Sequence, residues 1–142
     1  MRALLDVNCL LSLMDEDHVH HYRAQSWWGQ DPESGWASCA LTQNGYVRIS
    51  CQRAYANPQT LHVAIARLGR QVADSDHEFW RDDISITDDA LFDYSFILGP
   101  NRITDVYLLG LAVKNGGRLV TFDRGLPIAA VRGAEARHLV VL

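Results

Sequence analysis

Three aspartates stand where short apolar stretches end or where an amphipathic segment begins. Asp6 follows the apolar run Ala3-Leu4-Leu5 in MRALLDVN, and Asp123 follows Leu119-Val120 in RLVTFDRG. Asp105 lies near the start of ITDVYLLGLA. Three carboxylates in a small volume repel one another, so they favour a bound cation, and oxygen ligands select a hard ion such as Mg²⁺ or Mn²⁺. If the fold brings the three together, they indicate a metal site.

The same residues also have a purely structural interpretation, which their spacing leaves open. Asp6 and Asp123 can cap helices, because an aspartate side chain accepts hydrogen bonds from the backbone N–H groups at a helix start. Asp105 would lie in the first turn of its helix, where the helix dipole favours a negative charge. Only the arrangement of the three side chains in space decides between the two interpretations.

The segments that must position these aspartates alternate between short strands and helices. Such alternation predicts a parallel sheet with helical layers, and ligands bind such sheets beyond the carboxyl ends of the strands. Asp6 and Asp123 both fall at such ends. The expected strands are residues 2–5, 36–40, 84–86, 118–122 and 138–142. The expected helices are residues 8–14, 18–28, 60–72, 88–94 and 104–115, the last with Thr104 as N-cap and Gly116 as its C-terminal stop.

Length and composition restrict the class of protein. A chain of 142 residues is expected to form a single domain, residues 1–142, with one substantial core. Its formal net charge of -4 argues against a protein that coats nucleic acid nonspecifically, which would carry basic stripes. No apolar run approaches the roughly 20 residues of a membrane helix, and three cysteines without a CxxC pair suit free thiols. A cytoplasmic protein with no membrane segment is therefore expected.

Four short motifs together resemble the PIN-domain family, especially VapC-type toxin ribonucleases. They are LLDVN at the start, TQNG at residues 42–45, ITDVYLLGLA at residues 103–112 and LVTFDRGL at residues 119–126, so the resemblance runs nearly end to end. It implies an α/β fold, a PIN-like three-layer sandwich with a mostly parallel central sheet flanked by helices. It also implies a metal-dependent endoribonuclease that uses Mg²⁺ or Mn²⁺ and serves as the toxin of a type II toxin–antitoxin pair. The implied partners are an RNA substrate, a cognate antitoxin protein and a second copy of the chain, with no membrane.

The resemblance also assigns roles to residues of this chain. Asp6, Asp105 and Asp123 match the acidic positions that hold the metal ion, and they are the expected catalytic residues together with Gln43. The positions expected to support or contact the substrate are Asn8, Thr121 and Arg124. For Arg124, contact with the RNA backbone and a simple surface position are equally open.

Gln43 is where this chain departs from the family. Many relatives carry glutamate there, whereas glutamine offers a neutral carbonyl oxygen. We therefore expect one ion held by Asp6 and Asp105, with Asp123 bound directly or through water, and a second ion only when an RNA phosphate joins. The local pattern is also ambiguous, since Asn44-Gly45 favours a hairpin. The resemblance instead predicts a helix over residues 40–51, with Gly45 allowing close packing.

Two other functions compete with this interpretation. A catalytically weakened PIN-like protein that binds RNA or an antitoxin is the main alternative, because of Gln43. A receiver-type signalling domain is disfavoured, since no acidic pair adjoins Asp6 and the sole lysine, Lys114, falls inside a predicted helix. The tryptophans are expected in the core or a dimer surface rather than stacked on bases. The sequence segment with His18, His20 and His21 is interpreted as an exposed or partner-facing helix rather than a metal site.

Overall fold

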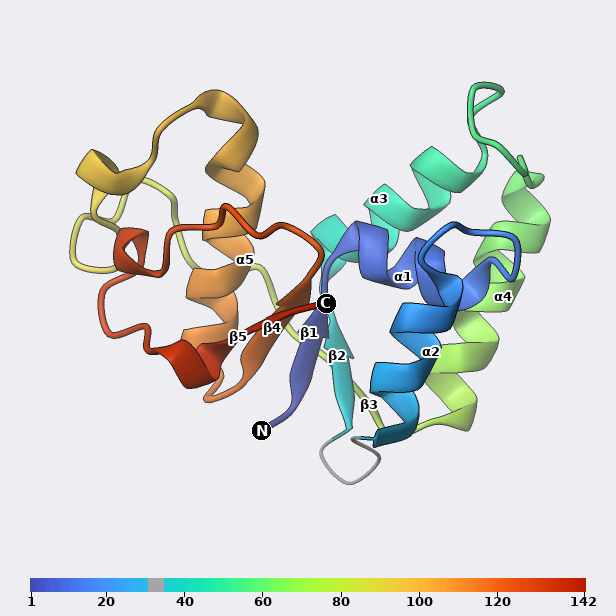
Figure 1. Cartoon of the computed structure of the whole chain (residues 1–142), viewed down its shortest axis with the longest axis horizontal. Coiled ribbons are helices and arrows are strands. Elements are labelled where there is room, and N and C mark those ends of the chain that lie inside the picture. Colours follow the sequence, from blue (N-terminus) through green and yellow to red (C-terminus); the bar gives the residue numbers. More distant parts are fainter. Residues whose placement is uncertain (31–34) are drawn as a thin grey trace.

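A five-stranded parallel sheet crosses the middle of the molecule in this computed structural model, which describes residues 1–30 and 35–142 (Figure 1). The order of the strands is β3-β2-β1-β4-β5, and every neighbouring pair is parallel. The strands are β1 (Ala3–Leu5), β2 (Trp36–Ser38), β3 (His77–Phe79), β4 (Arg118–Thr121) and β5 (Leu139–Val141).

The strand order reverses direction beside β1. From β1 the chain adds β2 and then β3 on one side, and it later adds β4 and β5 on the other. In the register of β1 and β4, Leu5 lies opposite Val120, and the N–H of Asp6 donates to the carbonyl oxygen of Val120 at 3.2 Å. Because ligands of open parallel sheets bind where the order reverses, the carboxyl ends of β1 and β4 form the expected place for a site.

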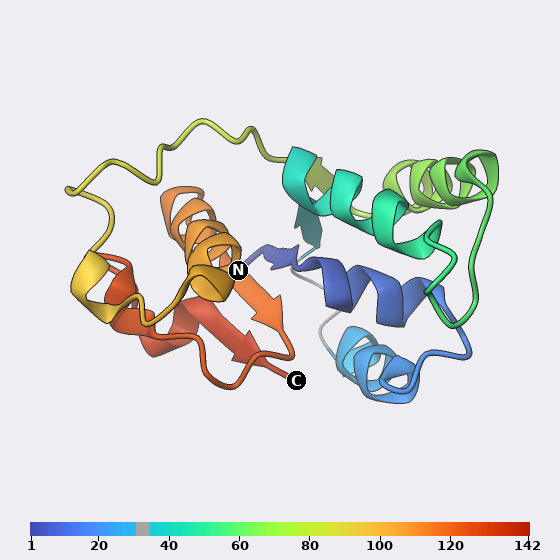
Figure 2. The ribbon, with the colours of Figure 1, turned by 90° about the horizontal axis from the view of Figure 1, so that it is seen from above.

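Helices cover both faces of the sheet, which makes three layers (Figures 1 and 2). On one face lie α1 (Val7–Met14), α2 (His21–Gln30), α3 (Ala40–Ser50) and α4 (Leu61–Asp74). On the other lies α5 (Ile103–Lys114) with short 3-10 turns from the second half of the chain. Within the described residues, no helix is long and apolar enough to cross a membrane.

Successive side chains along the strands pack alternately into two separate hydrophobic cores, one on each face of the sheet. Leu4 and Leu119 point to the α5 side, where they pack with residues such as Leu109. Leu5 and Val120 point to the opposite side and pack with residues of α1 to α4. Because successive strand residues face opposite sides of a sheet, β1 and β4 must be apolar on both faces, and all of β1 is buried.

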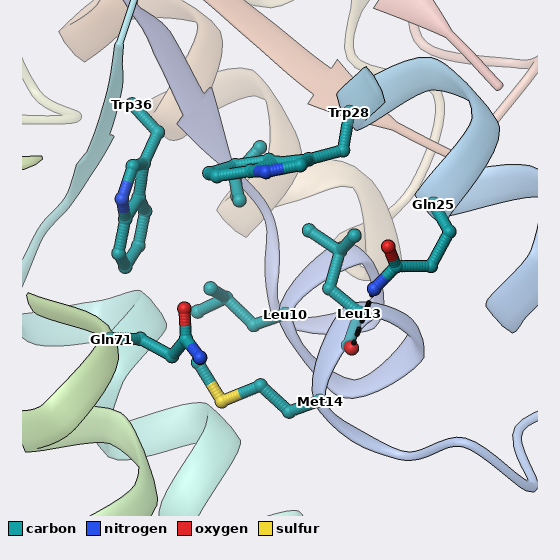
Figure 3. A pocket seen from close by; sticks show the side chains of 8 residues that line it. Leu10, Leu13, Met14, Gln25, Trp28, Trp36 and Gln71 are labelled. Carbon is teal, nitrogen blue, oxygen red and sulfur yellow. Dashed lines mark hydrogen bonds between the residues drawn. The ribbon is translucent and has the colours of Figure 1, made fainter. Parts of the chain in front are cut away.

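The tryptophans belong to these cores, as expected. Trp36 and Trp80 are buried, and Trp27 and Trp28 are partly buried against the core on the α1 side. Trp28 meets Trp36 edge to face, with ring centroids 6.2 Å apart. Figure 3 shows a small, largely apolar pocket at this junction. Its lining residues are Leu5, Leu10, Leu13, Met14, Gln25, Trp28, Trp36 and Gln71.

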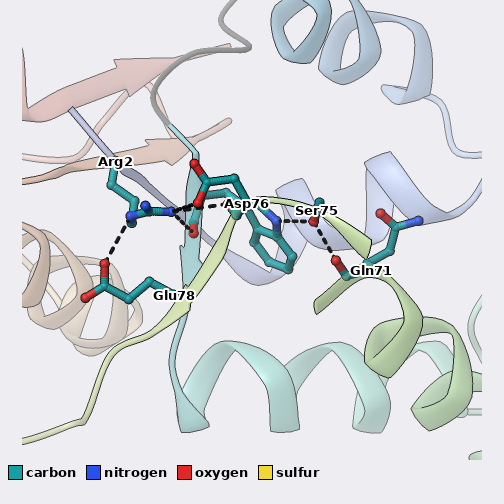
Figure 4. A network of polar contacts seen from close by, with 6 residues as sticks. Arg2, Gln71, Ser75, Asp76 and Glu78 are labelled. Carbon is teal, nitrogen blue, oxygen red and sulfur yellow. Dashed lines mark hydrogen bonds and ion pairs between the residues drawn. The ribbon is translucent and has the colours of Figure 1, made fainter. Parts of the chain in front are cut away.

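A polar network ties the amino ends of three strands together (Figure 4). The guanidinium of Arg2 pairs with Asp76 at 3.0 Å and with Glu78 at 3.1 Å, and it donates to the carbonyl oxygen of Trp36 at 3.2 Å. The two carboxylates are more than half exposed, so each ion pair alone adds little stability. Their combined effect is to connect the start of β1 to the edge strand β3 across β2.

Two of the predicted elements are wrong. The third strand is β3 at His77–Phe79, not residues 84–86, which are irregular although Ile84 and Ile86 pack against the α5 core. Residues 88–94 do not form the predicted helix. Residues 89–91 are a turn, in which the Asp88 carboxylate accepts the Ala90 N–H at 3.0 Å, Phe92 forms a bridge to Val131, and Tyr94 begins a short 3-10 helix.

The helices largely match expectation, with shifts at their ends. α4 begins after Thr60, whose hydroxyl accepts the Val63 N–H, and residues 40–51 are helical rather than a hairpin. α2 begins three residues later than predicted, at His21. Thr104 is not the N-cap of α5, since a 3-10 turn at Pro100–Arg102 leads directly into that helix. Gly116 does end it, with a φ of 66° that favours glycine.

Gly45 allows α1 and α3 to approach closely. A Cβ built on Gly45 would lie 2.5 Å from Cγ2 of Val7, whereas one built on Gly69 in α4 would meet nothing within 4 Å. We expect Gly45→Ala to destabilise the protein by about 1–3 kcal/mol through overpacking, although alanine is the better helix former. Gly69→Ala, the matched control, should stabilise it by up to about 1 kcal/mol. Urea unfolding measures both, and equal stabilisation by the two variants would contradict the close contact.

Candidate active site

Asp6 is fixed at the carboxyl end of β1 by its role as the N-cap of α1. Its Oδ1 accepts the N–H of Cys9 at 2.7 Å, and its residue is only 5% exposed. Burial raises the pKa of Asp6, while hydrogen bonds from the Thr121 hydroxyl and from the N–H groups of Cys9 and Asn8 oppose that shift. The capping interpretation is therefore correct for Asp6, whose carboxylate is buried while it caps α1.

Asp105 lies in the first turn of α5, on the opposite side of the sheet, and is partly buried. Burial, followed by the negative charges of Asp6 and Asp123, raises the pKa of Asp105 to about 6, and Arg102 acts in the opposite direction. Charges shift one another's pKa in this way only at short range. The fold thus brings together, within electrostatic reach, three carboxylates that are separated by 99 and 18 residues in the sequence.

Asp123 lies in the turn that follows β4. Its backbone N–H donates to the Thr121 hydroxyl at 3.0 Å, and its Oδ1 accepts the N–H of Gly125 at 2.8 Å. The other carboxylate oxygen forms an ion pair with Arg102. This pair, the strongest influence on the group, holds the pKa of Asp123 below its ordinary value.

Arg102 is a site residue that the sequence analysis missed. It precedes Asp105 by three residues, in the RITD stretch, so the two share one side of the start of α5. The sequence contained one signal for this role, which is that Arg102 is a cationic residue one helical turn before the candidate metal ligand Asp105. That signal is weak, because only the fold places Asp123 beside the same guanidinium.

The chemistry of these residues fits a hard divalent cation. Asp6 and Asp105 offer carboxylate oxygens only. Burial raises the pKa of both, and the charges of Asp6 and Asp123 add to the shift at Asp105, so a cation would favour the ionised form of each. In residues 1–30 and 35–142, however, no group of three or more His, Cys, Asp or Glu side chains is arranged closely enough to hold an ion. Asp123 turns to Arg102 instead, so the fold gathers the charges without forming a complete ligand shell.

Gln43 lies in the first turns of α3, and its interactions run toward β2 and β3. Its side-chain amide donates to the Ser38 hydroxyl at 2.9 Å, and that hydroxyl lies 2.8 Å from Nε2 of His77. Within the described part of the chain, these contacts do not join Gln43 to any of the three aspartates. A catalytic role for Gln43 stays a prediction.

The remaining predicted site residues fall into different environments. Thr121 is buried and acts on Asp6, so it belongs to the carboxylate group. Asn8 is exposed and contributes its backbone N–H to Asp6, while Arg124 is exposed directly after Asp123. The structure thus places all three close in sequence or space to the aspartates, and their contact with a substrate stays a prediction.

One of the three histidines in residues 18–21 reaches the segment that follows β4. The ring of His20 stacks on Phe122, next to Asp123, with ring centroids 4.7 Å apart. Nδ1 of His21 lies 2.7 Å from the carbonyl oxygen of Ser12, so this ring is used to dock α2 on α1. His18 and His20 precede α2 rather than lying on it, which corrects the predicted helical segment.

Comparison with known proteins points to one family. A family model described as PIN domain matches residues 3–132. The chain is 49% identical to Ribonuclease VapC44 of Mycobacterium tuberculosis over the whole of both chains. It is 42% identical to Ribonuclease VapC39 of the same organism, covering 94% of this chain and 96% of that one. The crystal structure of PAE2754 from Pyrobaculum aerophilum matches with a TM-score of 0.53 at 20% identity, covering 94% of this chain and 82% of that one, which confirms the predicted α/β fold.

The unfavourable environment of the Asp105 charge should have a measurable effect on the stability of the metal-free protein. Because its pKa is raised from 3.8 to about 6, the folded state binds the proton more tightly than the unfolded state does, and stability falls as the pH rises through that window. Asp105→Asn removes the charge, so at pH 8 in chelator it should be more stable than the wild type by about 1 kcal/mol, after allowance for solvent screening. At pH 3.5 the difference should vanish.

Denaturant unfolding at the two pH values measures this effect. Asp17→Asn, which changes an exposed aspartate at the far end of α1, is the matched control. If Asp105→Asn is no more stable than this control at pH 8, the carboxylates do not crowd one another.

Proposed function

The chain belongs to the PIN domain family, and on that premise we propose that it is a metal-dependent endoribonuclease, the toxin of a type II toxin–antitoxin pair. Its relatives named Ribonuclease VapC44 and Ribonuclease VapC39 support the activity. The observation that carries the proposal is the position of Asp6 at the carboxyl end of β1 and of Asp123 after β4, where the strand order reverses, with Asp105 within reach of both charges.

In this proposal, Asp6 and Asp105 hold one Mg²⁺ or Mn²⁺ ion, and Asp123 binds it directly or through water. When bound, such an ion activates a water molecule for attack on a phosphodiester and stabilises negative charge on the phosphate and the leaving oxygen. The residues of the chain position the ligands. The Cys9 N–H and the Thr121 hydroxyl fix the carboxylate of Asp6, and α5 presents Asp105 from the other layer.

The chain offers polar groups for an RNA strand around these carboxylates. Arg124 is exposed beside Asp123, where its guanidinium can approach a phosphate of the RNA backbone. Asn8 is exposed at the start of α1, beside Asp6. We assign both to substrate binding and Thr121 to support of Asp6.

A second candidate function is supported by Gln43. Its amide is neutral and hydrogen-bonded to Ser38, so it adds no charge to the carboxylate group. A PIN protein weakened in this way would bind RNA or an antitoxin without efficient cleavage. The two candidates separate in one assay: if the wild type does not cleave RNA with either metal while Gln43→Glu does, the second is correct.

Cleavage should depend on the buried and partly buried aspartates. We expect Asp6→Asn and Asp105→Asn each to reduce RNA cleavage in Mg²⁺ or Mn²⁺ by at least about 100-fold, because each removes a ligand of the ion. Asp17→Asn should retain wild-type activity. Circular dichroism is the check that the variants fold, and a wild-type rate for either site variant would refute the assignment.

A protein partner is also part of the proposal. We infer that the chain acts in the cytoplasm as a homodimer and that its antitoxin covers an apolar surface. Exposed apolar side chains on α4 provide a surface for the second copy of the chain, since Leu61, Val63 and Ile65 are each between 45% and 61% exposed. On α2 and the segment before it, Tyr22 and Val19 are each 85% exposed and add a second patch.

The oligomeric state tests the first part of that inference. Light scattering of the isolated protein should give about twice the chain mass of 15.9 kDa. Replacing Leu61 and Ile65 together by glutamate should reduce the mass to that of one chain if α4 forms the interface, whereas Tyr22→Glu should not. A wild-type monomer at high concentration would refute the dimer and leave the nuclease proposal intact.

A further inference from the structure

A histidine and a phenylalanine from distant parts of the chain stack on each other beside the carboxylates. The ring of His20, just before α2, lies on the ring of Phe122, just after β4, with centroids 4.7 Å apart and ring planes inclined by 24°. Phe122 is partly buried, whereas His20 is exposed. The stack therefore presents aromatic surface to solvent one residue before Asp123.

Hydrogen bonds on both sides of its backbone hold His20 in this place. The N–H of His20 donates to Nδ1 of His18 at 3.1 Å, and its carbonyl oxygen accepts the N–H of Ala24 at 3.0 Å, a bond that begins α2. Nδ1 of His21 lies 2.7 Å from the carbonyl oxygen of Ser12, which ties the same segment to α1. The position of the His20 ring is thus set by the fold before any substrate arrives.

The fold itself does not require a histidine at this position. An aliphatic side chain would cover the Phe122 ring and would be equally compatible with the two backbone bonds of residue 20. An imidazole instead keeps a flat aromatic face in an exposed position. Proteins that recognise single-stranded RNA stack unpaired bases on histidine and other aromatic side chains. The residue type therefore suits a nucleobase better than it suits the core.

The stack and the carboxylates lie on the two sides of the segment that follows β4. Phe122 packs against the core on the α1 side, whereas its neighbour Asp123 pairs with Arg102 at the start of α5. Adjacent Cα atoms are only about 3.8 Å apart. An RNA strand with one phosphate near Asp123 can therefore bring the base of a neighbouring nucleotide to the stack, and the exposed Arg124 can meet the backbone between them.

The charge of the chain gives such a contact a clear role in binding. With a formal net charge of -4, the protein has little general attraction for the phosphates of RNA. Stacking of bases on aromatic side chains contributes affinity that does not depend on net charge. An aromatic contact at the site would therefore supply binding that the rest of the surface does not.

We propose that His20 and Phe122 form a stacking site for one unpaired nucleobase of the RNA, next to the phosphate at the carboxylates. This inference rests on the proposed nuclease function, and it narrows the substrate to RNA that is single-stranded at the cut. A base inside a duplex is stacked between its neighbours and offers no free face to the His20 ring. Every base has an aromatic face, so the site recognises the lack of pairing and not one particular base.

RNA binding without metal tests the stacking site apart from cleavage. The full-length wild type, His20→Ala, His20→Phe and His62→Ala are titrated in chelator with a short, fluorescently labelled single-stranded RNA, and anisotropy gives the dissociation constants. His62 is exposed in the first turn of α4, so His62→Ala is the matched control. We expect His20→Ala to bind at least about fivefold more weakly than the wild type, since alanine cannot stack. His20→Phe and His62→Ala should bind within about twofold of it.

A 2-aminopurine base in the same RNA reports the stacking directly, because its fluorescence falls when it stacks. We expect this quenching at one position of the strand with the wild type and with His20→Phe, and its loss with His20→Ala. A duplex of the same sequence should bind the wild type and His20→Ala equally. Thermal unfolding is the check that His20→Ala folds, and His20→Phe keeps the test decisive because it retains both the backbone bonds and a flat ring.

Several results would overturn the inference. They are equal binding of the single strand by the wild type and His20→Ala, unchanged quenching in that variant, an equal loss of duplex binding, and no binding of the single strand by the wild type in chelator. A His20→Phe variant that binds as weakly as His20→Ala would also overturn it, because the charge or hydrogen bonding of the imidazole would then be responsible.

Cleavage is measured separately, so the failure of this inference and that of the proposed function are distinct. If the wild type cleaves RNA with Mn²⁺ or Mg²⁺ while His20→Ala binds as the wild type does, the stacking site is wrong and the nuclease proposal stands. If the wild type stacks the base but cleaves no RNA with either metal, the nuclease proposal is wrong, and the stacking site belongs to a protein that only binds RNA.

Discussion

The pairing of β1 with β4 is the contact on which the candidate site depends. Its register sets Leu5 against Val120, and the Asp6 N–H bonds to the Val120 carbonyl oxygen, so the chain leaves both strands at the same edge. The same two strands are buried on both faces, so a slide by one residue would move every side chain of the strand from one core into the other and disrupt the packing of both. The separation between Asp6 and the turn holding Asp123 is therefore fixed by the cores and not by the aspartates.

The cores also explain why the site can tolerate repulsion between its carboxylates. Asp6 is held from the α1 layer, and Asp105 and Arg102 are held from the α5 layer. Each layer packs on its own face of the sheet through its own apolar cluster. Burial of one large apolar side chain contributes about 1.5–3 kcal/mol. Many such side chains fill the two clusters, so their summed contribution offsets the repulsion between the buried Asp6 and the partly buried Asp105. The fold can thus keep unfavourable charges together for a ligand to neutralise.

The elements nearest the site could be predicted from sequence, because each carried a local signal. Strands β1 and β4 are apolar runs that end at an aspartate, and α4 and α5 show apolar residues at helical spacing. The third strand gave no such signal, since His77–Phe79 is largely exposed and becomes a strand by pairing with β2. The sequence also could not predict the direction in which the Gln43 side chain points, or the contact of Arg102 with Asp123. Each depends on partners that only the fold supplies, such as Ser38 and the turn after β4.

The thiol beneath Asp6 gives this edge of the protein a distinct chemical character. Sγ of Cys9 donates to the Val120 carbonyl oxygen at 3.3 Å, and burial, with the nearby charge of Asp6, raises the pKa of the thiol well above its ordinary value. Alkylating agents and oxidants attack the thiolate, which this environment suppresses. Cys39 is buried as well, and only Cys51 is partly accessible. The Cys9 thiol, next to Asp6, is therefore inert toward oxidation for as long as β1 and β4 stay paired.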